Sequence, residues 1–207
     1  MLWRHGRTAW NDDRRFQGQT DIELDDHGRR QARRTARVLA ALPPQALVSS
    51  DLARARATAA ELAALTGLPV SVDARLRETH AGRWEGLLAH EIQATDASTW
   101  EAWMAGDPAV RPGGGETRAE VADRAVAAVS EALPLVSPEG VLVVTTHGGT
   151  ARALIGRLLG LPEVEWHVLG GLANCSWSVL VESLHGWRLE EHNAGRLPEP
   201  VEGTDDA

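Results

Sequence analysis

The segment Val141-Leu142-Val143-Val144-Thr145-Thr146-His147-Gly148-Gly149 carries the clearest structural signal in the sequence. A run of apolar and β-branched residues ends at a polar turn, and a helix-like stretch rich in Ala and Leu follows as far as Leu159-Gly160. A continuous apolar strand, a polar turn and then a helix is typical of a buried parallel sheet. The segment therefore predicts an α/β fold in which His147 follows the end of a strand.

The same alternation of strands and helices recurs along the chain. Ala46-Leu47-Val48 predicts another strand, and Ser50 is expected to cap a helix that ends near Gly67. We also expect strands over 176–181 and 187–191, a helix from a cap at Asp25 to about Leu42, and a helix that runs to Leu133 behind a capping box at 117–120. Together these elements predict a three-layer α/β/α sandwich with a mostly parallel central sheet.

Residues 1–197 are expected to form one domain that contains a small lid insertion at about 79–115. The insertion is rich in Gly and Pro and contains Trp84, Trp100 and Trp103, which either contact a substrate or fill a satellite core. The tail from 198 to 207 has little apolar content and is expected to be disordered. Only three residues precede Arg4, so either the natural chain begins further upstream or its first strand is truncated.

Composition excludes several classes of function. The net charge is −8, which disfavours nonspecific binding to nucleic acid or to an anionic membrane. All 21 basic side chains are Arg, and Lys and Tyr are absent, which excludes a P-loop lysine, a Schiff base and a tyrosine acid or base. Cys175 is the single cysteine and is interpreted as a small buried residue. Without a signal peptide or a long apolar stretch, the chain is expected to be cytoplasmic.

Three polar clusters follow predicted strands, and they suggest one site. They are Arg4-His5-Gly6, Arg54 within one turn of Ser50, and His147-Gly148. The carboxyl ends of parallel strands meet at one crevice, where two arginines, two histidines and the N–H groups at a helix start would suit a phosphate dianion. His5 could accept a phosphoryl group while His147 donates to its oxygens, and Glu78, Glu85 or Glu91 could protonate the leaving alcohol.

These residues also resemble a known family. Leu2-Trp3-Arg4-His5-Gly6-Arg7-Thr8-Ala9-Trp10-Asn11 resembles the phosphohistidine signature of the histidine phosphatase superfamily, the phosphoglycerate mutase-like proteins. Further segments match in the same order, namely Gln17-Gly18-Gln19-Thr20-Asp21, Ser49-Ser50-Asp51-Leu52-Ala53-Arg54-Ala55, Arg77-Glu78-Thr79-His80-Ala81-Gly82-Arg83-Trp84-Glu85-Gly86 and Thr146-His147-Gly148-Gly149. The resemblance covers residues 2 to about 195.

The resemblance implies a mechanism and a set of site residues. It implies a covalent phosphohistidine on His5, Glu78 as proton donor and then acceptor, and a small phosphomonoester as substrate without metal or other cofactor. Catalytic and phosphate-binding roles are implied for Arg4, Asn11, Gln17, Gly18, Arg54, His147 and Gly148. Asn11 could equally cap a helix, Gln17 could be a surface residue, and Glu85 competes with Glu78. A homodimer is compatible with the sequence.

Hydrolysis is favoured over phosphoryl transfer between substrates. The resemblance implies a comparison with the glycolytic mutases, which hold the substrate carboxylate with Tyr and Lys side chains. This chain contains neither residue type. Within the superfamily, three segments look most like the glucosyl-3-phosphoglycerate phosphatases, namely 76–80, 114–117 and 169–177. Mutase-type transfer or a broad-specificity phosphatase are the alternatives. The chain lacks both a His-Glu-x-x-His metal motif and a Gly-x-Ser-x-Gly elbow, and its matched catalytic positions argue against an inactive binding protein.

Overall fold

A six-stranded sheet forms the centre of the computed structural model, which describes residues 1–195. Its order is β3-β2-β4-β1-β5-β6. The strands are β1 (Leu2–Arg4), β2 (Pro44–Ser49), β3 (Val70–Val72), β4 (Val141–Thr146), β5 (Trp177–Ser183) and β6 (Gly186–Ala194). Strands β1 to β4 pair in parallel, whereas β5 is antiparallel to β1 and to β6. The prediction of a mostly parallel sheet is confirmed.

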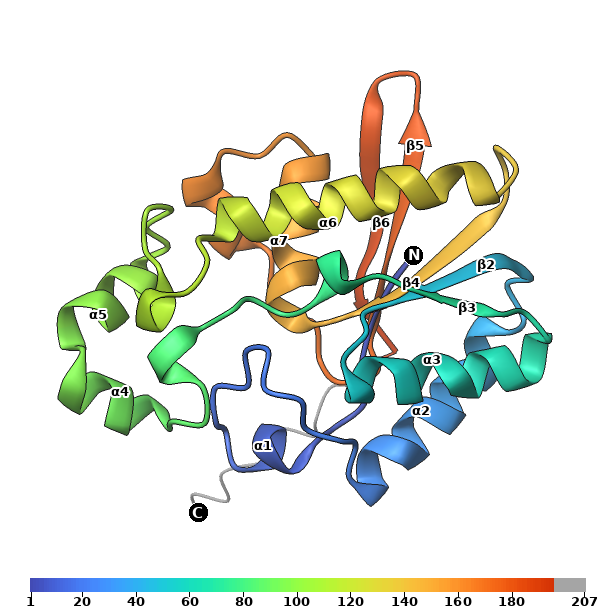
Figure 1. Cartoon of the computed structure of the whole chain (residues 1–207). Coiled ribbons are helices and arrows are strands. Elements are labelled where there is room, and N and C mark those ends of the chain that lie inside the picture. The colour runs from blue at the N-terminus through green and yellow to red at the C-terminus, as the bar shows by residue number, and fades with distance from the viewer. Residues whose placement is uncertain (196–207) are drawn as a thin grey trace, which may run out of the picture.

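Helices cover both faces of the sheet (Figure 1). Helices α2 (Asp26–Leu39) and α3 (Ala53–Thr66) cover one face, and α6 (Arg118–Ala132) and α7 (Gly148–Leu158) cover the other. Strand β4 serves both layers, because Val143 packs with the α2 and α3 side while Leu142 and Val144 pack with the α6 and α7 side. The unbroken apolar run of β4 is therefore explained by burial on both faces.

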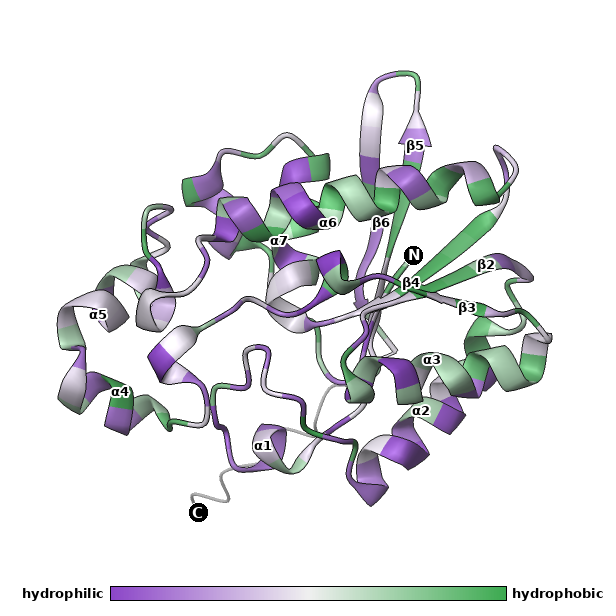
Figure 2. Ribbon diagram, in the orientation of Figure 1, coloured by the Kyte–Doolittle hydropathy of each residue, from purple (hydrophilic) through white to green (hydrophobic). Residues whose placement is uncertain are grey.

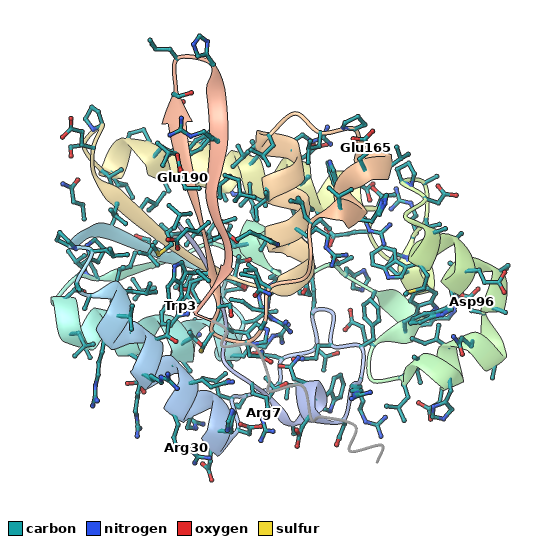
Figure 3. The ribbon with its side chains drawn as sticks, turned by 180° about the vertical axis from the view of Figure 1, so that it is seen from behind. Trp3, Arg7, Arg30, Asp96, Glu165 and Glu190 are labelled. Atoms are coloured by element: carbon teal, nitrogen blue, oxygen red, sulfur yellow. The ribbon has the colours of Figure 1, made fainter. Side chains whose placement is uncertain are left out.

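The distribution of polar residues agrees with this layering. Figure 2 shows that β2 and β4 at the centre are largely hydrophobic, whereas α2 and much of β6 are hydrophilic. In Figure 3, Trp3 lies inside the molecule, whereas Arg30, Asp96, Glu165 and Glu190 lie at its outside. Trp3 is fully buried, and its indole N–H donates to Cys175 O at 3.2 Å. The buried ring thus keeps its polar atom paired.

The register of the sheet brings three strand ends to one level. Arg4 lies opposite Thr146, and Ser49 lies opposite Thr145. The amide of His5 then donates to Thr146 O at 3.1 Å. The residues that follow β1, β2 and β4 therefore emerge together at the carboxyl edge of the parallel sheet, as the sequence predicts.

The segment 79–115 folds into short helices beside this edge (Figure 1). They are η2 (Gly82–Trp84), α4 (Ala89–Thr95), α5 (Ala97–Ala105) and η3 (Pro112–Gly114). Trp84 is 1% exposed and packs with Trp100, Trp103 and Phe16 at ring-centroid distances of 5.8–6.4 Å. The three tryptophans thus fill a satellite core, and the function of the segment as a lid stays a prediction.

The remaining elements are short. They are α1 (Ala9–Asp12), η1 (Ala74–Leu76), η4 (Leu133–Leu135) and η5 (Glu163–Val168). Within residues 1–195, no helix combines the length and the apolar character that a membrane span requires. The expected disordered tail at 198–207 lies outside the described residues.

Several sequence expectations about these elements are wrong. The predicted cap of α3 is incorrect, because Leu52 occupies the N-cap position without a side-chain hydrogen bond. Ser50 Oγ accepts from Leu52 N at 3.4 Å and lies 2.9 Å from His147 Nε2. Helix α2 ends at Leu39 rather than at about Leu42, and residues 40–43 connect it to the strand that begins at Pro44. Strand β3 was not predicted, because its three residues are half-buried or exposed and give no apolar run.

Candidate active site

His5 follows β1 and is 2% exposed. Its Nδ1 lies 2.7 Å from Gly6 O. A carbonyl oxygen can only accept, so Nδ1 carries the proton and the lone pair of the neutral ring lies on Nε2. Among residues 1–195 no hydrogen bond involves Nε2. The ring is thus fixed in the tautomer that a nucleophilic imidazole requires.

Gly6 is required at its position by close packing rather than by a special turn. Its φ is not positive. A Cβ at Gly6 would lie 2.5 Å from Gly28 O, on the first turn of α2. The amide of Gly6 donates to Thr58 Oγ1 on α3 at 3.1 Å. Two helices therefore press directly against the backbone behind His5.

Arg4 lies in the same site with most of its donors unused. It donates through Nη1 to Leu172 O, and its buried Nε has no partner among the described residues. A Cβ at Gly148 would lie 3.5 Å from Cζ and Nε of Arg4, an ordinary contact distance, so the guanidinium lies against the start of α7. A buried guanidinium with an unpaired N–H is suited to binding an anion.

Arg54 joins the site from the first turn of α3 and is completely buried. Its guanidinium donates to Thr20 O at 2.8 Å, to Gly18 O at 2.8 Å and to His147 Nδ1 at 3.2 Å. Burial lowers the pKa of Arg54 to about 10, which leaves it cationic at neutral pH. Its position between the loop at 18–20 and the second histidine confirms the expected convergence of these segments.

His147 lies beside His5, with ring centroids 5.1 Å apart. Its Nδ1 accepts from Arg54, so the proton of the neutral ring lies on Nε2, which is 2.9 Å from Ser50 Oγ. Both ring nitrogens therefore have protein partners. Donation from His147 to a phosphoryl oxygen requires that one of these bonds be exchanged, and this role stays a prediction. The function of Ser50 was missed, although the residue directly follows a strand, as His5 and His147 do.

Both histidines are held in the neutral form. Burial lowers the pKa of His5 and of His147 well below their usual value, and the positive charges of Arg54 and Arg4 lower both further. A neutral imidazole retains the lone pair that attacks phosphorus. The site can therefore keep a nucleophilic His5 in mildly acidic solution.

The buried neutral histidines predict that the free protein loses stability in acid. Below about pH 6.5 the unfolded chain binds protons that the folded chain does not, so the free energy of unfolding falls as the pH falls. Each such histidine contributes a slope of about 1.4 kcal/mol per pH unit. Urea unfolding between pH 7.5 and 5 in phosphate-free buffer measures this slope. In His147→Gln this slope should decrease by the contribution of one proton, about 1.4 kcal/mol per pH unit. A free energy of unfolding that does not depend on pH would contradict the assignment of buried neutral histidines.

Glu78 lies against the start of α7. Its carboxylate accepts from Thr79 N at 2.8 Å, Gly149 N at 3.0 Å and Thr150 N at 3.0 Å. A Cβ at Gly149 would lie 2.5 Å from Glu78 Oε1, so the glycine makes room for the carboxylate. The expectation that the N–H groups at 148–149 point to a phosphate is therefore wrong for Gly149, because Glu78 occupies this helix N-terminus.

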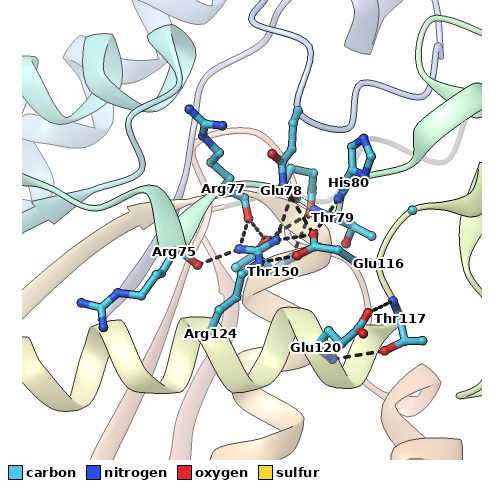
Figure 4. A network of polar contacts seen from close by, with 12 residues as sticks. Arg75, Arg77, Glu78, Thr79, His80, Glu116, Thr117, Glu120, Arg124 and Thr150 are labelled. Carbon is cyan, nitrogen blue, oxygen red and sulfur yellow. Dashed lines mark hydrogen bonds and ion pairs between the residues drawn. The ribbon is translucent and has the colours of Figure 1, made fainter.

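A polar network fixes the segment that carries Glu78 (Figure 4). Arg124 of α6 donates to Arg77 O at 2.7 Å and to Glu78 O at 3.0 Å, and it pairs with Glu116 at 2.8 Å. Glu116 also accepts from His80 N at 2.8 Å. The roles of Arg124 and Glu116 cannot be predicted from the sequence, because nothing local in the sequence relates α6 to residues 75–80.

The two other candidate acids have structural partners. Although its burial opposes this, hydrogen bonds from Thr20, Gln19 N and Ala81 N hold the pKa of Glu85 below its usual value. Glu91 accepts from Leu88 N at 2.7 Å and caps α4. Neither contact pattern favours these residues over Glu78.

The expected phosphate-binding residues occupy different environments. Asn11 is the third residue of α1 and completes a capping box with Thr8, and its Oδ1 also accepts from Asn174, which binds His5 O. Gln17 is buried, not on the surface, and its Oε1 has no partner among residues 1–195. Gly18 has φ +53°, and a Cβ there would clash with Glu85, so glycine is required.

Other reactive groups do not compete with His5. Burial raises the pKa of the Cys175 thiol to about 12, in agreement with an inert residue. Among residues 1–195, no three His, Cys, Asp or Glu side chains cluster in a way that could hold a metal ion. A metal-free reaction stays a prediction.

Comparison with known proteins relates the whole described chain to one family. The family model of the histidine phosphatase superfamily (branch 1) matches residues 1–195. A glucosyl-3-phosphoglycerate phosphatase of Mycolicibacterium vanbaalenii is 41% identical, over 94% of this chain and 93% of that protein. A probable phosphoglycerate mutase GpmB of Klebsiella pneumoniae is 36% identical, over 86% and 81%. The structure of mycobacterial glucosyl-3-phosphoglycerate phosphatase with VO3 aligns with a TM-score of 0.88 at 42% identity, over 93% and 97%.

Proposed function

Because the chain belongs to the histidine phosphatase superfamily and is a phosphatase, we propose that it hydrolyses glucosyl-3-phosphoglycerate through a phosphohistidine on His5. The curated relative named for this activity is 41% identical over 94% of the chain. The structure that aligns with a TM-score of 0.88 carries the same name. The substrate is thus a small phosphomonoester that also contains a sugar and a carboxylate.

The observation that carries the proposal is the fixed tautomer of His5. Its Nδ1 proton is held by Gly6 O, and its ring is buried 5.1 Å from that of His147. The guanidinium groups of Arg4 and Arg54 supply positive charge beside a phosphoryl group bound at Nε2. An imidazole lone pair beside preorganised cations supports covalent phosphoryl transfer.

The reaction proceeds in two steps. His5 Nε2 attacks phosphorus, the bond to the alcohol oxygen breaks, and protonated Glu78 gives its proton to that oxygen. Glu78, now a carboxylate, takes a proton from water, and the hydroxide attacks phosphorus and releases inorganic phosphate from His5. In both steps Arg4 and Arg54 stabilise the charge on the phosphoryl oxygens. We assign contacts to the bound phosphoryl group to His147, Asn11, Gln17, Gly18 and Gly148 as well.

Mutase-type transfer is the second candidate, because one relative is named a probable phosphoglycerate mutase. In that reaction the phosphoryl group on His5 returns to a carboxylate-containing alcohol rather than to water. The two reactions share the phosphoenzyme and differ in the acceptor of the second step, and therefore in the product. With 3-phosphoglycerate as substrate, release of inorganic phosphate without 2-phosphoglycerate supports hydrolysis.

Kinetics on a panel of phosphomonoesters tests the substrate. We expect kcat/KM for glucosyl-3-phosphoglycerate to exceed that for sugar phosphates, nucleotides and 3-phosphoglycerate by at least about 10-fold, the size of one good polar contact. Activity should persist after exhaustive chelation, because guanidinium groups supply the positive charge, and vanadate should inhibit it as a transition-state mimic. Equal activity on the whole panel would indicate a broad-specificity phosphatase. A strict need for added Mg²⁺ or Zn²⁺ would contradict the mechanism.

A further inference from the structure

Two arginines outside the phosphate site lack a carboxylate partner. Arg118 is the first residue of α6, and Arg152 lies in the second turn of α7. Within residues 1–195 neither forms an ion pair, whereas the nearby Arg157 pairs with Asp123 at 3.0 Å and with Glu163 at 3.1 Å. Unpaired cations are common on surfaces, and the other such arginines outside the phosphate site are exposed, whereas both of these side chains are half-buried.

Buried donor atoms on both arginines have no protein partner. They are Nη1 of Arg118 and Nε of Arg152. Arg118 is nevertheless held in place, because its Cζ lies 3.6 Å from the centre of the Trp103 ring and its Nη2 donates to Trp103 O at 2.7 Å. Arg4 Nε in the proposed phosphate site is unpaired in the same way. Arg157 Nε is also buried without a partner, but Nη2 of Arg157 pairs with Asp123 and Glu163. Buried donors without partners are costly in a folded protein, and on two arginines that lack a carboxylate they favour a ligand that accepts from them.

The two cations also repel each other. Burial lowers the pKa of Arg118 to about 10, and the positive charge of Arg152 lowers it further, although Asp107 opposes this. Burial likewise lowers the pKa of Arg152 against the opposing charge of Glu78. Neither acid lies within ion-pair distance of its arginine. A ligand anion between the two guanidinium groups would remove this repulsion.

A cavity lies beside the pair. Both arginines line a cavity of about 120 Å³, together with Trp103, Met104, Gly106, Glu163, Trp166 and His167. A Cβ at Gly171 would lie 3.3 Å from Arg152 Nη2, and the next residue, Leu172, accepts from Arg4. The charge of Glu78 acts on Arg152 as it does on Arg4. Arg152 therefore borders both this cavity and the segment at 171–172, which contacts Arg4 of the phosphate site.

We propose that Arg118 and Arg152 bind the carboxylate of the substrate while its phosphoryl group lies against His5. Guanidinium groups bind carboxylates through paired, charge-assisted hydrogen bonds, and the two unpaired donors are available for them. The inference rests on the proposed function, in which the substrate is a phosphorylated glycerate. It makes these two arginines responsible for a preference for phosphomonoesters that contain a carboxylate (acids) over those that do not (neutral esters).

Matched substrates test the assignment. One pair is glucosyl-3-phosphoglycerate and its analogue with a hydroxymethyl group in place of the carboxylate, and the second pair is 3-phosphoglycerate and glycerol 3-phosphate. The wild-type enzyme should prefer the acid in each pair. Arg118→Gln and Arg152→Gln should each lower kcat/KM for the acids by about 10- to 100-fold and change it less than about 3-fold for the neutral esters. Arg152→Lys should retain part of the preference for acids that Arg152→Gln loses. Arg157→Gln is the matched control, because Arg157 has carboxylate partners.

The outcomes separate this inference from the proposed function. If wild-type enzyme favours 3-phosphoglycerate over both glucosyl esters but still loses its preference for acids in the variants, the proposed substrate is wrong and the carboxylate site holds. If wild-type enzyme does not prefer acids, or if the variants lose activity equally on acids and neutral esters, the carboxylate site is wrong. Inhibition by vanadate should be unchanged in folded variants. Should a glutamine variant not fold, Arg152→Lys and the wild-type preference still decide.

Discussion

Replacing His5 by alanine is expected to abolish the phosphoenzyme and to lower kcat by about 10⁴-fold or more, the range seen when a covalent nucleophile is removed. The reason is geometric: within residues 1–195 the Nε2 lone pair of His5 has no hydrogen-bond partner and lies near Arg4 and Arg54, whereas Nδ1 of His147 accepts from Arg54. Brief incubation with labelled substrate, followed by an alkaline quench, measures the phosphoenzyme. A phosphohistidine should be stable in alkali and labile in acid.

His185→Ala is the control for this experiment. His185 is exposed in the turn between β5 and β6, far along the chain from every site residue, and its variant should keep the label and the activity. Thermal unfolding of both variants shows that they are folded. A label that persists in His5→Ala would show that another residue is the nucleophile. His147 is then the first residue to examine, because its ring lies beside that of His5.

Glu78→Gln is expected to cost an alkyl phosphate about 10²–10⁴-fold in phosphoenzyme formation, the usual contribution of a general acid, and to cost p-nitrophenyl phosphate far less. A sugar or glycerate alkoxide needs a proton when its bond to phosphorus breaks, whereas nitrophenolate is stable as an anion. Single-turnover kinetics isolates this step. With the nitrophenyl ester the variant should accumulate phosphoenzyme, because Glu78 also activates the water of the second step.

The control is Glu85→Gln, a second carboxylate that accepts backbone N–H groups near the site. Its loss should disturb the loop at 17–20 and affect both substrates alike. Equal losses for both substrates in Glu78→Gln would show that Glu78 only shapes the pocket by capping α7. In that case Glu85 would become the acid to examine.

Residues directly after strands could be predicted from the sequence, because strand ends in a parallel sheet have a known meeting point. His5, Arg54 and His147 lie together as expected, and Glu78 lies at the start of α7 beside them. The layers and strands β2 and β4 followed from apolar runs that local pattern alone identifies. These successes share one cause, which is that short sequence segments contain the signal.

The errors concern contacts between distant segments. A hydroxyl after a strand can cap a helix or bind a side chain, and only the position of His147 shows that Ser50 does the latter. The N–H groups of α7 looked available for phosphate until the fold placed Glu78 on them. Arg118 and Arg152 come from different helices, so their shared cavity could not be predicted from spacing.

The pairing of β1 also determines when the enzyme can first become active during synthesis. The strand before His5 is made before its neighbours, which are β4, near residue 144, and β5, near residue 177. These pairings close very long loops, and such contacts form late and slowly. On the ribosome, the nucleophile therefore emerges well before β4 and β5, and these must follow before the second histidine can lie beside it. A nascent or prematurely terminated chain thus has the catalytic histidine but no phosphatase activity.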